Sequence, residues 1–333
     1  MVIVVTGAAG FIGYHVTRAL LARGEQVLGV DNFSSYYDPG LKQARVNAIE
    51  KEFGNAFAFH RADFAEPAEL AAVVQDVDFA RLVHLGAQVG VRYGLQNPAS
   101  YVRSNVVGHL NILELARHRK LRHLVYASSS SVYGSNSSLP FRLEDRTDRP
   151  LSLYAATKKA DEVMSESYSS LFRLPMTGLR FFTVYGPWSR PDMAMWLFTK
   201  AILAGEPLDL FNGGAMRRDF TYIDDVVAGV LACLDSPPMD DHREKPGGSV
   251  SPHALYNIGN HRSEDLMELI RILEESVGRK AITNMLPMQP GDVVDTFADI
   301  SAIRNAHGFE PETSINEGVP RFVEWYKRYH GIA

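Results

Sequence analysis

Short runs rich in β-branched residues alternate with longer amphipathic stretches through the first half of the chain. The runs predict strands at residues 2–5, 26–30, 56–63, 81–85, 123–127 and 176–182, and the amphipathic stretches predict helices at 14–23, 68–74, 104–117 and 154–172. Strands that are apolar on both faces and joined by helices form parallel sheets, because right-handed crossovers place helices on both sides. The pattern therefore predicts an α/β fold with a doubly wound parallel sheet.

The alternation fades after about residue 183, where Pro and Gly separate shorter pieces. Residues 236–253 are polar and rich in proline, which indicates a loop that is mobile or variable. We expect residues 1–180 to form the sheet domain and residues 224–260 to rejoin it. Residues 181–223 and 261–333 would then form a smaller C-terminal lobe that binds the substrate.

The bulk composition narrows the class of partner. The chain has 333 residues, 46% of them hydrophobic, and a formal net charge of −5 without a run of like charges. Nothing here indicates binding to nucleic acid or to a membrane surface, so a small molecule is the expected partner. The single cysteine, Cys233, excludes an internal disulfide and a cysteine zinc site, and the histidines show no metal-binding pattern. We therefore expect a protein without a metal. The start of the chain lacks the features of a signal peptide, so we also expect the protein to be soluble and cytoplasmic.

A glycine-rich loop follows the first predicted strand, in the segment 6-TGAAGFIGYHV-16. Gly7 permits a tight turn, Gly10 lets the backbone approach a pyrophosphate, and Gly13 lets the helix pack on its strand. Such a motif alone is weak evidence, since glycines also occupy ordinary strand-to-helix turns. Here a strand precedes it, a helix follows, and Asp31 ends the second strand, 18 positions beyond Gly13. A carboxylate there accepts bonds from ribose hydroxyls and repels a 2′-phosphate, which predicts a Rossmann domain that binds NAD rather than NADP.

A tyrosine and a lysine stand four residues apart in 154-YAATK-158, at the start of a predicted helix. They share a helical face, so the Lys158 ammonium can lie beside the Tyr154 phenol and lower its pKa from about 10 toward neutrality. This spacing is common on solvated helix faces. Here the tyrosine–lysine pair follows a dinucleotide loop and a strand that ends in four serines, Ser128 to Ser131. In that context the spacing indicates a catalytic base.

These residues carry a family resemblance. The sequence resembles the extended short-chain dehydrogenase/reductases that act on nucleotide-linked sugars, through 6-TGAAGFIG-13, 84-HLGAQ-88, 128-SSSSVYG-134, 154-YAATK-158, 180-RFFTVYGP-187, 218-RDFTYIDD-225 and 290-PGD-292. The resemblance implies that Tyr154 is the base, that Lys158 tunes it and holds the nicotinamide ribose, and that Ser129 bonds the reacting sugar oxygen.

The same resemblance implies the binding residues. The expected NAD contacts are Gly7, Gly10, Phe11, Ile12, Gly13, Asp31, Asn32, Asp63, Phe64, Leu85, Ala87, Asn105, Tyr154 and Lys158. The expected contacts with the UDP-sugar are Arg92, Ser128, Ser129, Ser130, Thr183, Arg190, Arg218 and Asp292. Three assignments have plain alternatives: Asp63 as a helix N-cap, Arg190 as a solvated loop arginine, and Asp292 as a turn carboxylate.

The two positions after the hydroxyl residue indicate the reaction. Relatives that are dehydratases or decarboxylases carry an acid there, whereas this chain has Ser130 and Ser131. An epimerase needs no second acid or base. The resemblance of 33-FSSYYDPGLKQARV-46, 90-GVRYG-94 and 186-GPWSRPDMA-194 to glucuronate 4-epimerases implies inversion of C4 of UDP-glucuronate to give UDP-galacturonate, through a 4-keto intermediate and bound NADH. Ser189 departs from the glycine that is usual before this arginine.

Other functions stay open at this point. The alternatives within enzymes are a UDP-glucose/UDP-galactose 4-epimerase and then a UDP-glucuronate decarboxylase. A catalytically silent nucleotide sensor is the alternative outside enzymes, and the presence of Tyr154, Lys158 and Ser129 together argues against it. The predicted helices at 101–117 and 161–172 resemble those that pair in dimers of this group, so a homodimer is expected.

Overall fold

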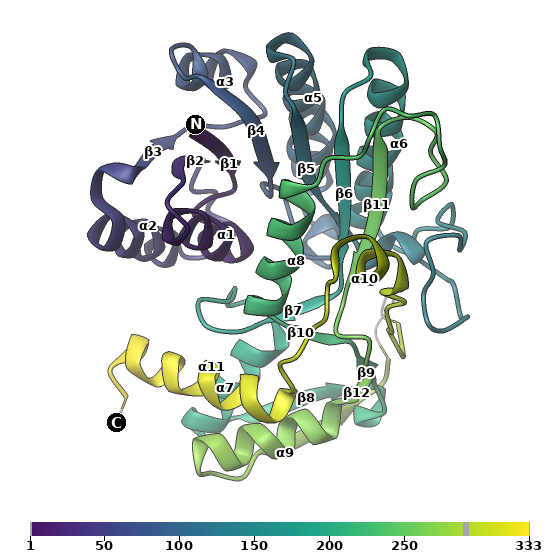
Figure 1. The fold of residues 1–333 in the computed structure, drawn as a ribbon. Helices are drawn as coiled ribbons and strands as arrows, with labels where there is room; N and C mark the ends of the chain where they lie inside the picture. Colours follow the sequence, from purple (N-terminus) through teal and green to yellow (C-terminus); the bar gives the residue numbers. More distant parts are fainter. Residues whose placement is uncertain (1, 289–292, 333) are drawn as a thin grey trace.

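The computed structural model describes residues 2–288 and 293–332. Its centre is a seven-stranded parallel sheet in the order β11-β6-β5-β4-β1-β2-β3 (Figure 1). The strands are β1 (Val2–Thr6), β2 (Gln26–Asp31), β3 (Phe57–Arg61), β4 (Phe79–His84), β5 (His123–Ser129), β6 (Met176–Phe181) and β11 (His253–Ile258). The predicted doubly wound α/β fold is confirmed.

Both faces of this sheet are covered by helices, which explains why successive apolar residues of its central strands are buried on opposite sides. Ile3 and Val5 pack with one cluster of buried side chains, whereas Val4 between them packs with the other. The first cluster includes residues of α1 (Phe11–Ala22), α2 (Pro39–Phe53) and α8 (Ile223–Asp235), and the second includes residues of α3 (Pro67–Val74) and α5 (Gly108–Arg119). Helix α6 (Leu153–Phe172) lies beside α5 on that second face.

Two helical segments differ from the sequence prediction. The helix expected at 104–117 begins earlier, because α4 (Pro98–Tyr101) continues through the π-helical segment η3 (Val102–Val107) into α5. Pro98 suits a first helical turn, where its missing N–H needs no partner. Helix α2 was not predicted, because its apolar residues do not form one stripe and it buries Lys42 and Arg45.

The later part of the chain builds a smaller lobe beyond the carboxyl ends of the strands (Figure 1). Its strands pair as β10 (Phe220–Tyr222) with β7 (Thr183–Tyr185), β12 (Glu264–Asp265) with β9 (Arg217–Arg218), and β13 (Ile282–Leu286) with β8 (Pro207–Phe211). Its helices are α7 (Ala194–Ala204), α9 (Leu266–Val277) and α11 (Ile315–His330), whereas α10 (Ser301–His307) packs against β11 and α8 of the main sheet. Between these segments the chain returns to the main sheet, since β11 pairs with β6 from His253 to Ile258.

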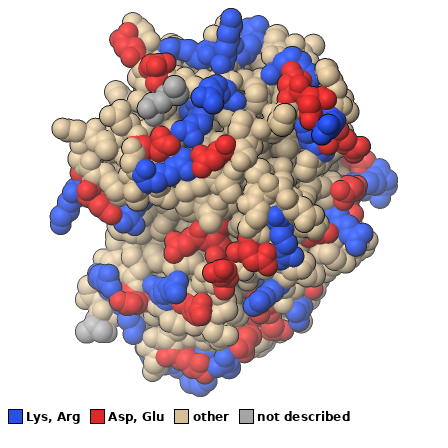
Figure 2. Space-filling model, in the orientation of Figure 1, with Lys and Arg blue, Asp and Glu red and all other residues tan. Residues whose placement is uncertain are grey.

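The segment 236–253 is irregular up to the start of β11, as expected of a proline-rich loop. It is nevertheless anchored at α6: the Ser249 hydroxyl donates to Glu166 in this helix at 2.9 Å, and the Arg173 guanidinium, directly after the helix, pairs with Asp240. Basic and acidic side chains are interspersed on the face shown in Figure 2. No helix in the described part of the chain is long and apolar enough to cross a membrane.

Candidate active site

A cavity lies at the carboxyl ends of the central strands, where the glycine loop, the segment after β4, the serines at the end of β5 and the start of α6 meet. Fifteen of the predicted site residues line it: Gly7, Gly10, Phe11, Ile12, Gly13, Asp31, Leu85, Ala87, Ser128, Ser129, Ser130, Tyr154, Lys158, Thr183 and Arg190. Because ligands of open α/β sheets bind where parallel strands end, this is the candidate active site.

The glycine loop forms a tight backbone cradle. Gly7 has φ +73°, and a Cβ there would lie 2.6 Å from the Gly86 nitrogen. A Cβ on Gly13 would collide with the Gly7 carbonyl oxygen. Helix α1 begins directly after this loop at Phe11, so its free N–H groups face the cavity end of the loop. The loop therefore fits the diphosphate of a dinucleotide, and any side chain at these two glycines would deform it.

Asp31 ends β2 at the cavity wall and has a partner that sequence reasoning missed. Its Oδ1 accepts hydrogen bonds from the Phe33 N–H at 2.9 Å and from the Lys42 ammonium at 3.1 Å. Lys42 belongs to the unpredicted helix α2 and also lines the cavity. A cofactor ribose at Asp31 would therefore meet a carboxylate that is already oriented by a lysine.

Tyr154 and Lys158 stand on the first turns of α6, as their spacing predicted. The Lys158 side chain is 2% exposed, and its ammonium donates to the Ala127 carbonyl at 2.9 Å and to Asp161 Oδ2 at 3.0 Å. The ring of Tyr154 lies edge-on to that of Tyr101, with centroids 6.4 Å apart. Asp161, three residues beyond Lys158, was missed by sequence reasoning although the spacing places both on one helical face.

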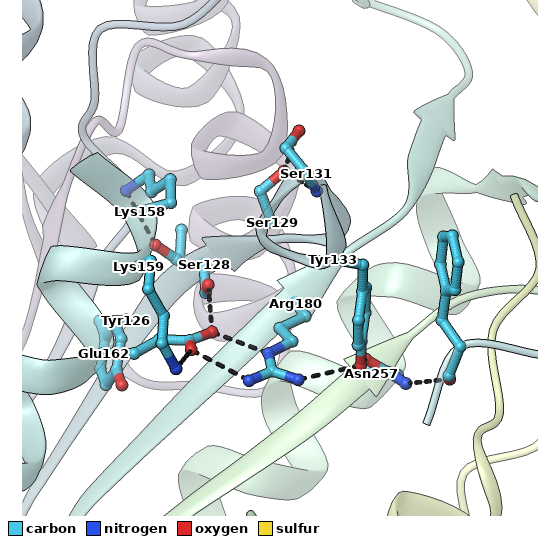
Figure 3. Close-up of polar contacts among 12 residues, drawn as sticks. Tyr126, Ser128, Ser129, Ser131, Tyr133, Lys158, Lys159, Glu162, Arg180 and Asn257 are labelled. Atoms are coloured by element: carbon cyan, nitrogen blue, oxygen red, sulfur yellow. Dashed lines mark hydrogen bonds and ion pairs between the residues drawn. The ribbon is translucent and has the colours of Figure 1, made fainter. Parts of the chain in front are cut away.

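Figure 3 shows that the Ser128 side chain points toward Glu162, whereas those of Ser129 and Ser131 point toward each other. The Ser128 hydroxyl donates to Glu162 Oε1 at 2.7 Å, which directs it behind the cavity wall. Ser129 caps the short helix η4 (Ser130–Tyr133): its oxygen accepts the Ser131 N–H, and its hydroxyl donates to the Ser131 hydroxyl at 3.0 Å. A hydroxyl has one hydrogen, so Ser128 would have to break its bond to Glu162 before donating to a substrate.

A buried ion pair holds this turn from behind (Figure 3). The Arg180 guanidinium on β6 donates to both oxygens of Glu162, at 2.8 and 3.0 Å, and each side chain is 2% exposed. Arg180 also donates to the Tyr133 hydroxyl at 3.0 Å, and Tyr133 donates to Asn257 Oδ1 at 2.7 Å. The network links α6, β5, η4, β6 and β11. Glu162 stands four residues after Lys158, but sequence reasoning did not single out either member of the pair.

Arg190 lies at the cavity wall in a fork-shaped ion pair with Asp192, with distances of 2.9 and 3.0 Å. The Tyr36 hydroxyl donates to the same carboxylate at 3.0 Å. The alternative of a freely solvated Arg190 therefore does not describe this structure. A sugar carboxylate or a diphosphate that bound Arg190 would share the guanidinium with Asp192 or displace Asp192 from it.

Several predicted residues do not line this cavity. The Asp63 carboxylate is used by Ala65 N–H, Asn32 and Arg103, and Phe64 packs against His84. The Asp63 carboxylate precedes α3, but the N-cap position of that helix is Glu66.

Asn105 is buried and supports the loop after β4, since its side chain bonds both the N–H and the carbonyl of Gln88, at 2.7 and 3.0 Å. Arg92 lies over the ring of Phe211, 4.7 Å from its centroid. Arg218 lines a second, adjoining cavity together with Ser130 and Thr183. Asp292 lies outside the described residues.

The fold and this site define the class of protein. The chain belongs to the NAD dependent epimerase/dehydratase family, which matches residues 3–259. The family expected from the sequence and its NAD cofactor are thereby confirmed. No group of three potential metal-ligating His, Cys, Asp or Glu side chains occurs among residues 2–288 and 293–332.

Individual relatives are similar over nearly the whole of this chain. The chain is 46% identical to Protein CapI of Staphylococcus aureus, covering 99% of each chain. It is 45% identical to UDP-glucuronate 4-epimerase 1 of Arabidopsis thaliana, over 99% of this chain and 77% of that one. Among solved structures, the UDP-glucuronic acid 4-epimerase of Bacillus cereus, in complex with UDP-glucuronic acid and NAD, superposes with a TM-score of 0.88 at 34% identity, covering 99% of this chain and 100% of that one.

Proposed function

We propose that this chain is an NAD-dependent 4-epimerase that converts UDP-glucuronate to UDP-galacturonate. The observation that carries the proposal is the chemistry of the cavity wall. Tyr154, Lys158 and Ser129 lie together there, and Asp31 is the only carboxylate among the described lining residues. An epimerase needs one acid–base group and no second acid. The relatives that act on UDP-glucuronate support this choice of sugar.

The residues divide the chemistry between them. Tyr154 accepts the proton of the C4 hydroxyl and later returns it, with Lys158 held beneath by Ala127 and Asp161. Ser129 bonds the same sugar oxygen, exchanging its present partner Ser131 for the substrate. NAD, which Gly7, Gly13 and Asp31 would hold at the cavity wall, would supply the reversible hydride transfer at C4.

The position of the sugar can be inferred from the two cavities. Ser130 and Thr183 line both the cofactor cavity and the adjoining one, so they stand at the junction. Arg218 lines the second cavity, and its guanidinium suits the UDP phosphates that the family resemblance assigns to it. A substrate that spans the junction places its hexuronic acid between Tyr154 and Arg218.

The 4-keto intermediate carries a hazard. The C5 carboxylate is then β to a ketone, and it leaves as carbon dioxide when its bond lies perpendicular to the carbonyl plane. We propose that Ser130 and Thr183, as neutral donors at the junction, hold the carboxylate away from that orientation. Thr183→Val and Ser130→Ala should therefore release UDP-pentose from UDP-glucuronate at several times the wild-type fraction of turnovers. Product chromatography that finds no additional pentose in either variant would reject this clamp.

The substrate test uses purified NAD-bound protein with UDP-glucuronate, UDP-glucose and UDP-galactose in parallel. We expect UDP-galacturonate to form from UDP-glucuronate at least tenfold faster than either neutral sugar is epimerised, because a site that binds a carboxylate rejects a substrate that lacks it. Preference for UDP-glucose would favour the alternative 4-epimerase. Pentose as the main product would favour the decarboxylase.

We further propose that the protein is a cytoplasmic homodimer. Exposed apolar side chains on η3, α5 and α6 support a paired face: Val102, Val107, Leu110, Val163, Leu171 and Phe172. Sedimentation equilibrium should give twice the mass of 37.0 kDa. A monomer at micromolar concentration would contradict the dimer without touching the proposed reaction.

A further inference from the structure

The ammonium of Lys158 has a buried counter-ion. Asp161 Oδ2 lies 3.0 Å from it, and the two side chains are 2% and 1% exposed. A second N–H goes to the Ala127 carbonyl at 2.9 Å. Since a lysine has three N–H donors, one remains for the cavity that Lys158 shares with Tyr154.

Asp161 itself is incompletely satisfied. Its Oδ1 is buried and has no hydrogen-bond partner among the described residues. Burial outweighs the attraction of Lys158 and raises the pKa of Asp161 to about 6. The carboxylate is therefore mostly ionised at neutral pH, and Lys158 is the cation that it contacts.

The other titratable groups around Asp161 do not supply a competing charge. Burial lowers the pKa of His84 on β4 to about 3 and that of His109 on α5 well below its usual value, so both rings are neutral. Burial raises the pKa of Tyr126 on β5, which keeps its phenol neutral. Glu162 on α6 is matched by Arg180 on β6 and by Lys159.

We infer that Asp161 is a positioning residue that fixes the Lys158 ammonium and offsets part of its charge, and so limits how far Lys158 acidifies the Tyr154 phenol. The inference rests on the proposed role of Tyr154. This effect of Asp161 matters for the proposed reaction cycle, because Tyr154 must both accept and return a proton. Such a group works best with a pKa near the working pH. The Asp161 carboxylate carries the charge that opposes the Lys158 ammonium at this point of the wall.

Asp161→Asn tests the inference because it removes the charge and keeps the shape and an acceptor oxygen. The pKa of Tyr154 in the NAD-bound protein should fall by roughly 1 unit. The measurement is phenolate absorbance against pH, taken as the difference from Tyr154→Phe in the same background, because the chain has 14 tyrosines. The acid limb of kcat/KM for UDP-glucuronate should move to lower pH by the same amount.

Asp161→Asn leaves the hydrogen bond from the Lys158 ammonium to the Ala127 carbonyl in place. Glu166→Gln is the matched control, because it neutralises a carboxylate on the same helix that bonds Ser249 and His253 instead of Lys158. It should leave the Tyr154 titration unmoved. Asp161→Ser gives the same charge change should the asparagine variant not fold.

Each outcome of the Tyr154 titration supports or overturns the inference. An unchanged Tyr154 pKa, or one that rises because Lys158 has lost its proton, overturns the inference. The titration needs no sugar, so it is independent of the identity of the substrate. If Tyr154→Phe removes no titrating phenolate from the wild-type protein, the proposed role of Tyr154 itself is wrong.

Discussion

The sharpest stability prediction concerns Arg180→Met, which removes the cation beneath the serine turn. The Glu162 carboxylate would remain 2% exposed, with the Ser128 hydroxyl and the Lys159 ammonium at 3.2 Å as its remaining side-chain partners. Removing one member of a buried pair costs about 3–5 kcal/mol, because an uncompensated charge stays in a low dielectric. Lys159 is partly exposed and supplies some compensation, so we expect a loss of about 3 kcal/mol at pH 8.

The loss should depend on pH in a definite direction. Burial pushes the pKa of Glu162 upward, but the charge and hydrogen bonds of Arg180 outweigh it and hold that pKa below its usual value. A carboxyl with a lowered folded-state pKa contributes stability above its unfolded pKa and loses it as the pH falls through the folded value. Without Arg180 the burial effect prevails, and Glu162 takes up a proton more readily. The deficit of Arg180→Met should therefore shrink between pH 8 and pH 5.5.

Urea unfolding at these two pH values measures the effect. The double variant Arg180→Met/Glu162→Gln should recover more than half of the loss at pH 8, since no buried charge remains. Arg18→Met is the matched control: its pair with Glu52 is exposed, at 38% and 45%, and should be worth less than about 1 kcal/mol. A deficit below about 1 kcal/mol for Arg180→Met, or one equal at both pH values and in the double variant, would contradict this account of the pair.

Two further predictions concern the cofactor cradle. In Gly7→Ala the alanine must adopt φ +73° and place its Cβ 2.6 Å from the Gly86 nitrogen. The variant should therefore lose at least about 1–2 kcal/mol of folding stability and most of its affinity for NAD, which calorimetric titration measures. Unchanged NAD binding would show that the loop is not the diphosphate site. Asp31→Asn should weaken NAD and strengthen NADP, because Lys42 at 3.1 Å then loses its counter-ion and faces a 2′-phosphate. The NADP/NAD affinity ratio should rise about tenfold or more, and a constant ratio would be incompatible with the assigned role of Asp31.

The features that could be predicted from the sequence were short motifs and elements with a periodic pattern of apolar residues. The glycine loop, and Tyr154 with Lys158, are each set by residues within a few positions of one another, and the alternation of apolar runs with amphipathic helices was enough to predict the sheet. Helix α2 lacks an apolar stripe, so Lys42 could not be expected beside Asp31. The Arg180 partner of Glu162 lies 18 positions away on another element, and only tertiary packing brings the two together.

The direction in which a serine hydroxyl points could not be predicted from the sequence either. This direction determines which serines can bind the sugar. Ser128 appeared equivalent to its neighbours, but Glu162, kept ionised by Arg180, is an acceptor and requires the Ser128 hydrogen. The clamp proposed for the sugar carboxylate therefore rests on Ser130 and Thr183.

The buried carboxylates complete the explanation of why this site suits epimerisation. Asp161 and Glu162 lie close to the catalytic lysine and the serine turn, yet neither lines the cavity, because Lys158 and Arg180 hold them behind its wall. Apart from Asp31, the described lining residues of this cavity thus include hydroxyls and cations but no carboxylate. In the proposed cycle Tyr154 takes the proton of the C4 oxygen and then returns it. The same two ion pairs that stabilise the turn would thereby also determine the product.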